Sequence, residues 1–399
     1  MCGIVGAIAH RDVAPILVEG LKRLEYRGYD SAGLAIMSSQ QDQIVRIRTE
    51  GKVQQLADSV KHSTANGMLG IAHTRWATHG KPSESNAHPH LSFDDLALVH
   101  NGIIENHDEL RQALISNGYT FSSETDTEVA VHTIHKHLQG DGKLLQAVYK
   151  ASGELAGAFA FGIIRKQDPN TLIAVRRGSP LVIGIGQHEH FIASDVIALL
   201  PVTQQFIYLE DDDIAEITCD GVTIYNKSFQ KVERAIHTIN HTQDSVSRGK
   251  YRHFMLKEIF EQPRAVCDTL EARVPHDHVL PQAFGVNADA IFASIKRVQI
   301  VACGTSYHAG LVGKYWLESL AKIPTRVEIA SEFRYRDGVI EPDTLFVAIS
   351  QSGETADTLA ALKKAKDNHF SATLAICNVA ESTLVRESDL TFLTRAGIE

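Results

Sequence analysis

A change of hydrophobic pattern near residue 250 constrains the fold of this 399-residue chain more than any other feature. Up to about residue 225 the chain holds many short β-type runs with few helical patterns between them, including GIVGAIA, AGLAIM, LGIAHT, LALVHN and GAFAFGIIR. From about residue 251, five strand candidates alternate with helical segments: VQIVAC, TRVEI, TLFVAIS, ATLAIC and LTFLT. The first pattern predicts an α+β layered sandwich, and the second predicts a doubly wound parallel α/β unit.

A polar stretch, residues 226–250, separates the two patterns. It has no sustained apolar period, which indicates an interdomain linker. We therefore expect one domain over residues 2–225 and a second over residues 251–399. A chain of this length is sufficient for two domains.

Two helix starts are marked in the first domain. The helical pattern DVAPILVEGLKRL begins with Asp12, which is expected to act as its N-cap. Thr125 and Glu128 have the spacing of a capping box, in which each side chain bonds the backbone N–H group of the other residue.

Composition and charge exclude several classes of protein. A net charge of −9 argues against a nucleic acid or an anionic membrane as the main partner. None of the five cysteines forms a C-x-x-C pair, which argues against a disulfide framework or a zinc ribbon and favours a reducing cytoplasm. The longest apolar run, residues 155–164, is too short to span a bilayer, and the first residues do not have the pattern of a signal peptide.

Twenty histidines raise the question of a metal site. The candidates are the HPH run at 88–90, the HDH run at 276–278, and the pair His132 and His135. No cysteine or carboxylate accompanies them at the spacing of a known site, so we expect hydrogen-bonded or surface histidines and no metal.

Cys2 is a candidate nucleophile because of its position. Removal of the initiator methionine would leave a thiol and a free α-amino group on one residue. An α-amine titrates near pH ~8 and can act as general base toward its neighbouring nucleophile. Gly3 would allow a substrate to approach the backbone closely. The alternative is a cysteine that serves only packing.

Polar residues follow later strands of the first domain. Asn101 and Gly102 could offer a side-chain and a backbone N–H group to an oxyanion, although Asn-Gly is also a common turn. Asp126 begins a helix, where a carboxylate is favourable for the dipole alone. Arg75 ends a strand and could simply be solvated.

Two hydroxyl-rich turns in the second domain lie between a strand and a helix: ACGTSYH at 302–308 and SQSGETAD at 350–357. Hydroxyls and backbone N–H groups at a helix N-terminus bind phosphate without lysine, although the same residues can be ordinary helix caps. A Walker A pattern and a G-x-G-x-x-G after a strand are both missing, which disfavours a nucleotide cofactor.

The motifs of the first domain together resemble the glutaminase domain of class II amidotransferases, which has a four-layer N-terminal-nucleophile fold. They are MCGIVGAI, LEYRGYDSAG, GIAHTRWATHG, NAHPH, VHNGIIEN and SETDTE. The resemblance implies that Cys2 attacks the glutamine amide and that Asn101 and Gly102 form the oxyanion hole. It implies that Arg75 binds the α-carboxylate of glutamine and Asp126 its α-ammonium group. It also implies that further residues contact glutamine: Arg27, Trp76, Thr78 and His79.

The second domain resembles the sugar-isomerase (SIS) domains of the glucosamine-6-phosphate synthase family, through ACGTSY, EIASEFRYR, SQSGETADTLAAL, AICNV and LVRESDL. The resemblance implies a cytoplasmic homodimer that transfers the amide nitrogen of glutamine to fructose 6-phosphate. It implies amination with ketose-to-aldose isomerisation, in hexosamine biosynthesis, without a metal or cofactor. The phosphate would be held by six residues: Thr305, Ser306, Ser350, Gln351, Ser352 and Thr355.

The chain departs from this family after Glu399, where a second sugar-isomerase subdomain would follow. We therefore expect these 399 residues to hydrolyse glutamine, to bind the sugar phosphate in part, and to form little glucosamine 6-phosphate. Two alternatives stay open at this stage: a stand-alone glutaminase, and a sugar-phosphate-binding regulator. A regulator would normally carry a DNA-binding module, for which the sequence has neither a helix-turn-helix element nor a basic patch.

Overall fold

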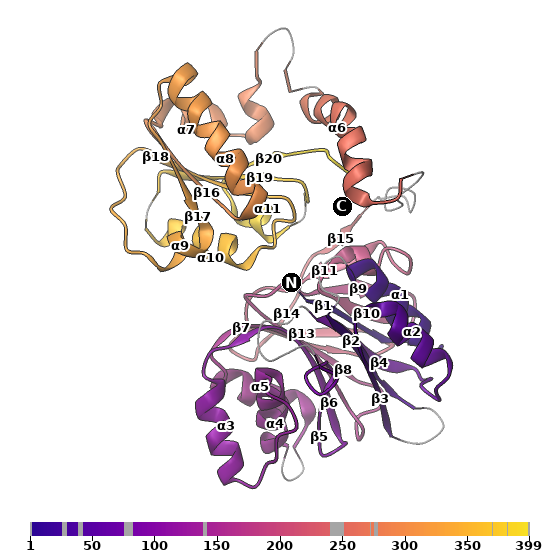
Figure 1. Cartoon of the computed structure of the whole chain (residues 1–399). Helices are drawn as coiled ribbons and strands as arrows, with labels where there is room; N and C mark the ends of the chain where they lie inside the picture. The colour runs from indigo at the N-terminus through magenta and orange to yellow at the C-terminus, as the bar shows by residue number, and fades with distance from the viewer. Residues whose placement is uncertain are drawn as a thin grey trace. The chain divides into compact units, whose positions relative to one another are not determined.

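A computed structural model describes the chain except for residues 1, 26–29, 39–42, 76–82, 139–141, 240–250, 272, 275–277, 369, 381 and 398–399. The chain divides into two compact units, Met1–His241 and Thr242–Glu399 (Figure 1). Each unit has its own sheets and its own core.

The first unit contains two antiparallel sheets. The strand order of the eight-stranded sheet is β15-β11-β9-β10-β1-β4-β2-β3, and that of the seven-stranded sheet is β14-β13-β12-β8-β7-β6-β5. The strands of the first sheet are β1 (Gly3–Ile8), β2 (Ser31–Met37), β3 (Ile44–Glu50), β4 (Leu69–Arg75), β9 (Val182–Ile185), β10 (His190–Ala193), β11 (Gln205–Tyr208) and β15 (Ile236–Thr238). Those of the second are β5 (His90–Ser92), β6 (Leu96–Ile104), β7 (Gly157–Arg165), β8 (Leu172–Arg177), β12 (Asp213–Ile217), β13 (Val222–Tyr225) and β14 (Lys231–Val232).

The two sheets pack face to face between two layers of helices (Figure 1). One apolar cluster joins the two sheets, with Ile4 and Ile71 on one sheet and Val99 and Ala160 on the other. A second cluster covers the outer face of the eight-stranded sheet, and a third covers that of the seven-stranded sheet. This αββα arrangement confirms the predicted α+β four-layer fold. The outer layers are α1 (Ala14–Leu24) and α2 (Val53–Lys61) on one side, and α3 (His107–Ser116), α4 (Asp126–His137) and α5 (Leu144–Glu154) on the other, with a short 3-10 helix η2 (Val196–Ala198).

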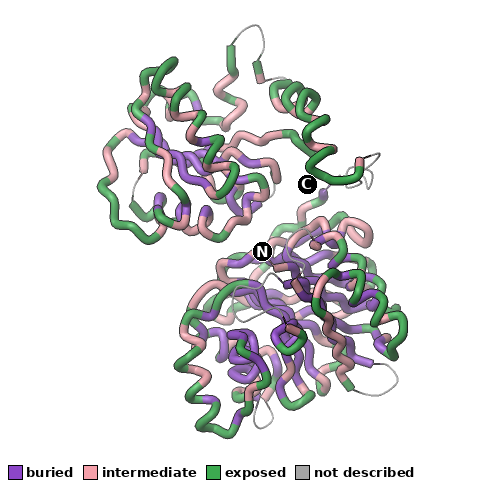
Figure 2. Tube along the Cα trace, viewed as in Figure 1, coloured by how far each residue is buried: buried purple, intermediate pink, exposed green. Residues whose placement is uncertain are grey.

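Strand β1 lies in the middle of this sandwich, and all six of its residues are buried (Figure 2). It pairs with β4 from Gly3↔Thr74 to Ile8↔Leu69 and with β10 on its other side. A strand that is buried on both faces has a continuous apolar sequence rather than an alternating one, and GIVGAI is such a sequence. Cys2 directly precedes β1. Because Gly3 pairs with Thr74, Cys2 lies beside the end of β4.

The second unit is built around a five-stranded parallel sheet in the order β17-β16-β18-β19-β20. One face packs on α9, α10 and α11, and the other on α7 and α8. The first strand lies inside the sheet and the chain winds outward in both directions, which confirms the predicted doubly wound α/β unit. Its elements are α6 (Phe254–Leu270), η4 (Pro281–Phe284), α7 (Ala288–Ser294), β16 (Arg297–Ala302), α8 (Gly304–Trp316), η5 (Leu317–Ala321), β17 (Thr325–Ile329), α9 (Ala330–Tyr335), β18 (Thr344–Ser350), α10 (Ala356–Asp367), β19 (Ala372–Cys377), α11 (Thr383–Glu387) and β20 (Leu390–Leu393).

The structure differs from the sequence expectation in the range predicted as a linker and at the start of α1. Strands β14 and β15 lie inside the range predicted as a linker, 226–250, and β15 pairs with β11 from Gln205↔Thr238 to Ile207↔Ile236. Each has only one apolar residue, so neither shows the apolar alternation that marks a longer strand. Helix α1 has Val13 rather than Asp12 as its N-cap, although the Asp12 carboxylate still accepts a hydrogen bond from the backbone N–H of Ala14.

Candidate active site

Cys2 and Asn101, which lie 99 residues apart in the chain, meet where the ends of β1 and β6 come together. The side-chain nitrogen of Asn101 donates a hydrogen bond of 3.1 Å to the backbone carbonyl oxygen of Cys2. Asn101 is buried in β6 of the seven-stranded sheet, whereas Cys2 is half-buried at the start of the eight-stranded sheet. The contact therefore depends on the face-to-face packing of the two sheets.

Arg75 ends β4, beside β1, and its side chain is buried. Burial lowers the pKa of the Arg75 guanidinium, and the nearby groups of Cys2, Asp126 and Asp30 act against that shift. Asp126 is the first residue of α4, and its carboxylate oxygen Oδ2 accepts a hydrogen bond of 2.9 Å from the backbone N–H of Ile104. One cation, one carboxylate and one thiol are thus gathered at the ends of β1, β4 and β6.

Gly102, the next residue along β6, has a backbone conformation that excludes side chains. Its φ is +127°, and a Cβ atom at this position would lie 2.0 Å from the carbonyl oxygen of Ala158. Gly102 pairs with Phe159 of β7, so the overlap is with the backbone of the neighbouring strand and not with a flexible side chain. Glycine is therefore required here by both the φ angle and the close approach.

Replacing Gly102 with alanine is expected to lower the free energy of unfolding of the first unit by about 2–5 kcal/mol, because φ strain and backbone overlap add. Urea denaturation measures the loss. Gly153→Ala in α5 is the matched control, since a Cβ atom there meets no atom within 4 Å. Equal stability of the two variants would contradict the close approach of β6 and β7 at Gly102.

Four buried histidines belong to the same region as Arg75 and Asn101: His73, His88, His90 and His100. His73 and His88 stack with ring centroids 4.1 Å apart, and the His88 and His90 centroids are 5.1 Å apart. Burial lowers the pKa of His73 to about 3 and that of His88 and His90 well below the usual value. Neighbouring histidines and Arg75 add to the shift at His88.

These rings are held by hydroxyls and backbone groups. Nε2 of His88 and Nδ1 of His100 lie 3.1 and 2.9 Å from the hydroxyl oxygen of Thr127, beside Asp126. Within the described ranges, no group of three or more His, Cys, Asp or Glu residues could hold a metal ion.

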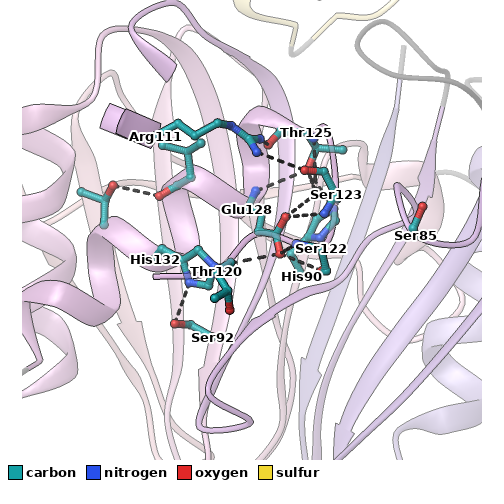
Figure 3. A network of polar contacts seen from close by, with 12 residues as sticks. Ser85, His90, Ser92, Arg111, Thr120, Ser122, Ser123, Thr125, Glu128 and His132 are labelled. Carbon is teal, nitrogen blue, oxygen red and sulfur yellow. Dashed lines mark hydrogen bonds and ion pairs between the residues drawn. The ribbon is translucent and has the colours of Figure 1, made fainter. Parts of the chain in front are cut away.

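A buried carboxylate, Glu128, supports the start of α4 (Figure 3). It accepts hydrogen bonds from the backbone N–H groups of Ser122 and Ser123 at 2.9 and 2.7 Å and from both of their hydroxyls. Burial raises the pKa of Glu128, but these four hydrogen bonds outweigh burial, and the net shift is downward. The predicted capping box is therefore only half formed. Thr125 accepts from the backbone N–H of Glu128, whereas the carboxylate bonds Ser122 and Ser123 instead of Thr125.

The hydroxyl-rich turns of the second unit meet at the carboxyl ends of adjacent strands, since β16 and β18 are paired up to Ala302↔Ile349. Ser350 ends β18, and its hydroxyl accepts a hydrogen bond of 3.0 Å from the backbone N–H of Gly353 and lies 3.4 Å from the Thr355 hydroxyl. Thr355 is the N-cap residue of α10. The other four predicted residues lie in two places: Thr305 and Ser306 in the first turn of α8, and Gln351 and Ser352 in the loop after β18.

Four of the predicted glutamine-binding residues lie outside the described residues: Arg27, Trp76, Thr78 and His79.

Comparisons with known proteins agree with both halves of this description. Residues 73–201 match a model of the glutamine amidotransferase domain, and residues 291–399 match a model of the SIS domain. Over all 399 residues the chain is 60% identical to the glutamine–fructose-6-phosphate aminotransferase (isomerizing) of Legionella pneumophila strain Paris, and 58% identical to that of Pseudomonas putida KT2440. The chain belongs to the glutamine–fructose-6-phosphate aminotransferase family. It spans 66% and 65% of the length of these two relatives.

A solved structure outside this family shares the fold. The glutamine phosphoribosylpyrophosphate amidotransferase of B. subtilis, complexed with ADP and GMP, superposes with a TM-score of 0.52 at 18% identity. The match covers 94% of this chain and 81% of that chain. At this identity the likeness concerns the fold alone.

In the parts of the chain that the structure describes, no helix combines the length and the apolarity required to cross a membrane.

The sequence interpretation of this family member missed two polar residues that lie close to the candidate residues in space or in sequence. His73, inside the motif AHTR, lies 3.0 Å from Asn101 through its Nε2 atom. Glu354, inside SQSGETAD, accepts a hydrogen bond of 2.7 Å from the backbone N–H of Thr383 at the start of α11. The available signal for His73 was a histidine directly after the apolar part of the buried strand LGIAHTR.

Proposed function

We propose that the chain takes part in the release of ammonia from the side-chain amide of glutamine and its transfer to fructose 6-phosphate, which gives glutamate and glucosamine 6-phosphate. These 399 residues would supply glutamine hydrolysis and part of the sugar-phosphate binding. The observation that carries the proposal is the hydrogen bond from the Asn101 amide to the backbone of Cys2. It supports the proposal because a side-chain N–H donor lies beside the residue proposed as the nucleophile. Both residues belong to motifs of the glutamine amidotransferase resemblance.

The first half-reaction follows from the chemistry of Cys2 without Met1. The α-amine takes the thiol proton, and the thiolate attacks the amide carbon of glutamine. The negative charge on the amide oxygen is stabilised by the Asn101 side chain and the Gly102 backbone N–H. The amine returns the proton to the leaving nitrogen, ammonia departs, and water hydrolyses the glutamyl thioester to glutamate.

The amino-acid end of glutamine would be held by opposite charges. Arg75 binds the α-carboxylate through two parallel N–H donors, and Asp126 binds the α-ammonium group. Both residues are buried, at 4% and 6% exposure, so little water would compete with the bound glutamine for these two groups. A zwitterion satisfies both charges at once, which a simple carboxylic acid or amine would not do.

The phosphate of the sugar would bind in the second unit, at the carboxyl ends of β16 and β18, where doubly wound folds bind their ligands. The Thr355 hydroxyl lies at the start of α10, so a phosphate there would also face the positive end of the helix dipole. The hydroxyls of Ser350 and Thr355 lie 3.4 Å apart and would both donate hydrogen bonds to the same phosphate group. The remaining ligands in this proposal are Thr305, Ser306, Gln351 and Ser352.

The test measures glutamate and amino sugar from the purified 399-residue chain with glutamine, in the presence and absence of fructose 6-phosphate. The proposal expects glutamate release that accelerates when fructose 6-phosphate is added, with amino-sugar formation measured alongside. A rate of glutamate release that is the same with and without fructose 6-phosphate would favour a stand-alone glutaminase. Binding of the sugar phosphate without any glutamate release would favour a regulator.

The proposal includes the cytoplasm as the compartment and a homodimer as the assembly. All five cysteines carry free thiols, as suits a reducing compartment. The exposed apolar side chains of Tyr315, Trp316 and Leu320 in the second unit suit an interface between copies. Sedimentation of the chain at several concentrations tests the assembly.

A further inference from the structure

The side-chain amide of Asn101 is bonded at both ends. Its nitrogen donates to the carbonyl oxygen of Cys2 at 3.1 Å, and its oxygen lies 3.0 Å from Nε2 of His73. Because the nitrogen faces Cys2, the oxygen must accept a hydrogen bond from His73. We therefore assign the hydrogen of the His73 ring to Nε2.

The His73 ring is itself fixed. Its residue has no exposed surface in β4, and its ring stacks on His88 at a centroid distance of 4.1 Å and an interplanar angle of 30°. His88 is held in turn, because its Nδ1 atom accepts from the backbone N–H of His100 and its Nε2 atom contacts the Thr127 hydroxyl. The Nε2–H group of His73 therefore points at Asn101 from a rigid support.

The titratable and charged groups around His73 are His88, His100 and Arg75. None of them is a carboxylate that would stabilise an imidazolium ion. Burial lowers the pKa of His73 to about 3, and the neutral ring keeps one donor and one acceptor nitrogen at every pH at which an enzyme of this kind would be assayed.

We infer that His73 is a positioning residue for catalysis: its Nε2–H group holds the Asn101 amide with the nitrogen turned toward the reacting carbon. The inference rests on the proposed function, in which Asn101 stabilises the oxyanion. An amide without this partner can rotate by 180°, because its two ends have nearly the same shape. Rotation would turn the amide oxygen of Asn101 toward the oxyanion. Two oxygen atoms with negative charge would then repel each other where an N–H donor had stabilised the oxyanion.

The expected effect is on the transition state and not on glutamine binding. Loss of one oxyanion donor typically costs about 10²–10³-fold in kcat, so loss of its orientation should cost about 10–100-fold. KM should stay within about threefold, because Arg75 and Asp126 would still bind the amino-acid end. A residue that only fills space would change both constants together through misfolding.

The experiment compares His73→Leu, which has no donor, with His73→Gln, which can place an amide N–H near the Nε2 position. Glutamate release gives kcat and KM. The rate of Cys2 alkylation by iodoacetamide is measured in parallel, because this substitution reaction forms no oxyanion and does not require Asn101. The inference expects the kcat loss in the leucine variant, most of the activity in the glutamine variant, and unchanged alkylation in both.

Equal kcat in both variants and the unsubstituted chain would overturn the inference, as would a fall in alkylation that matches the fall in kcat. If the leucine variant does not fold, His73→Asn replaces it, since its shorter amide does not reach Asn101. Failure of the proposed function is separate: the unsubstituted chain would then release no more glutamate than Cys2→Ala.

Discussion

Replacing Cys2 with alanine is expected to lower glutamate release from glutamine by at least about 10⁴-fold, because the atom that attacks the amide carbon is removed. Cys2 precedes β1 and is not one of the strand's six buried core residues. The free energy of unfolding should therefore change by less than about 0.5 kcal/mol. Enzymatic assay of glutamate, together with urea denaturation, separates loss of chemistry from loss of fold.

Cys219→Ala is the matched control, since Cys219 is the other half-buried cysteine of the first unit. Burial raises the pKa of the Cys219 thiol, with Asp220 and Glu189 adding to the shift, so this thiol is a poor nucleophile. Its removal should leave glutamate release unchanged. Residual activity in Cys2→Ala close to that of the unsubstituted chain would show that another group attacks glutamine. Mass spectrometry of the intact chain should also find Met1 removed.

Acid is expected to destabilise the first unit as the pH falls below about 6.5, because its buried histidines are neutral in the folded state. Burial lowers the pKa of His73 from 6.5 to about 3. Between these two values the unfolded chain binds a proton that the folded chain does not, so stability rises with pH and is lost on acidification. At pH 5 the loss from His73 alone is about 2 kcal/mol, at about 1.4 kcal/mol per pH unit.

His88 and His90 contribute in the same direction. Burial lowers the pKa of both, and the cationic side chains of Arg48 and Arg46 add to the shift at His90. The total loss should be several kcal/mol by pH 5, a large part of the stability of an ordinary domain.

Hydrogen exchange of backbone amides, corrected for the intrinsic effect of pH, measures this loss strand by strand. Protection in β4 and β6 should fall between pH 7.5 and pH 5. The strands of the parallel sheet, β16 to β20, contain no histidine and are the internal control. An equal loss of protection in both units, or none in β4, would contradict the assignment of neutral buried histidines.

Much of the fold was predictable because its strands are short apolar runs. The run GAFAFGIIR coincides with β7 at Gly157–Arg165, and TRVEI coincides with β17 at Thr325–Ile329. Among the strands that the sequence interpretation missed, β14 and β15 are two and three residues long, with one apolar residue each. They form because an adjacent strand offers unpaired backbone groups, a reason that no pattern within their own residues expresses.

The capping box shows the same limit at the level of one side chain. The spacing of Thr125 and Glu128 correctly indicated the start of α4, since the Thr125 side chain bonds the Glu128 backbone. The predicted partner of the Glu128 carboxylate, the backbone N–H of Thr125, was wrong. The loop before the helix instead brings four donors from Ser122 and Ser123 to this carboxylate. The conformation of that loop depends on residues outside the helix.

The sequence by itself determined the local features: a cysteine directly before a buried strand, the strand-to-helix turns rich in hydroxyls, and the alternation of strands and helices in the second unit. These follow from apolar periodicity and turn chemistry within a few residues. Only the tertiary structure decided that Asn101 would face Cys2 across 99 residues and that His73 would hold it. Such contacts depend on the register of β1 with β4 and on the packing of two sheets. Burial in that same packing also keeps the histidines neutral.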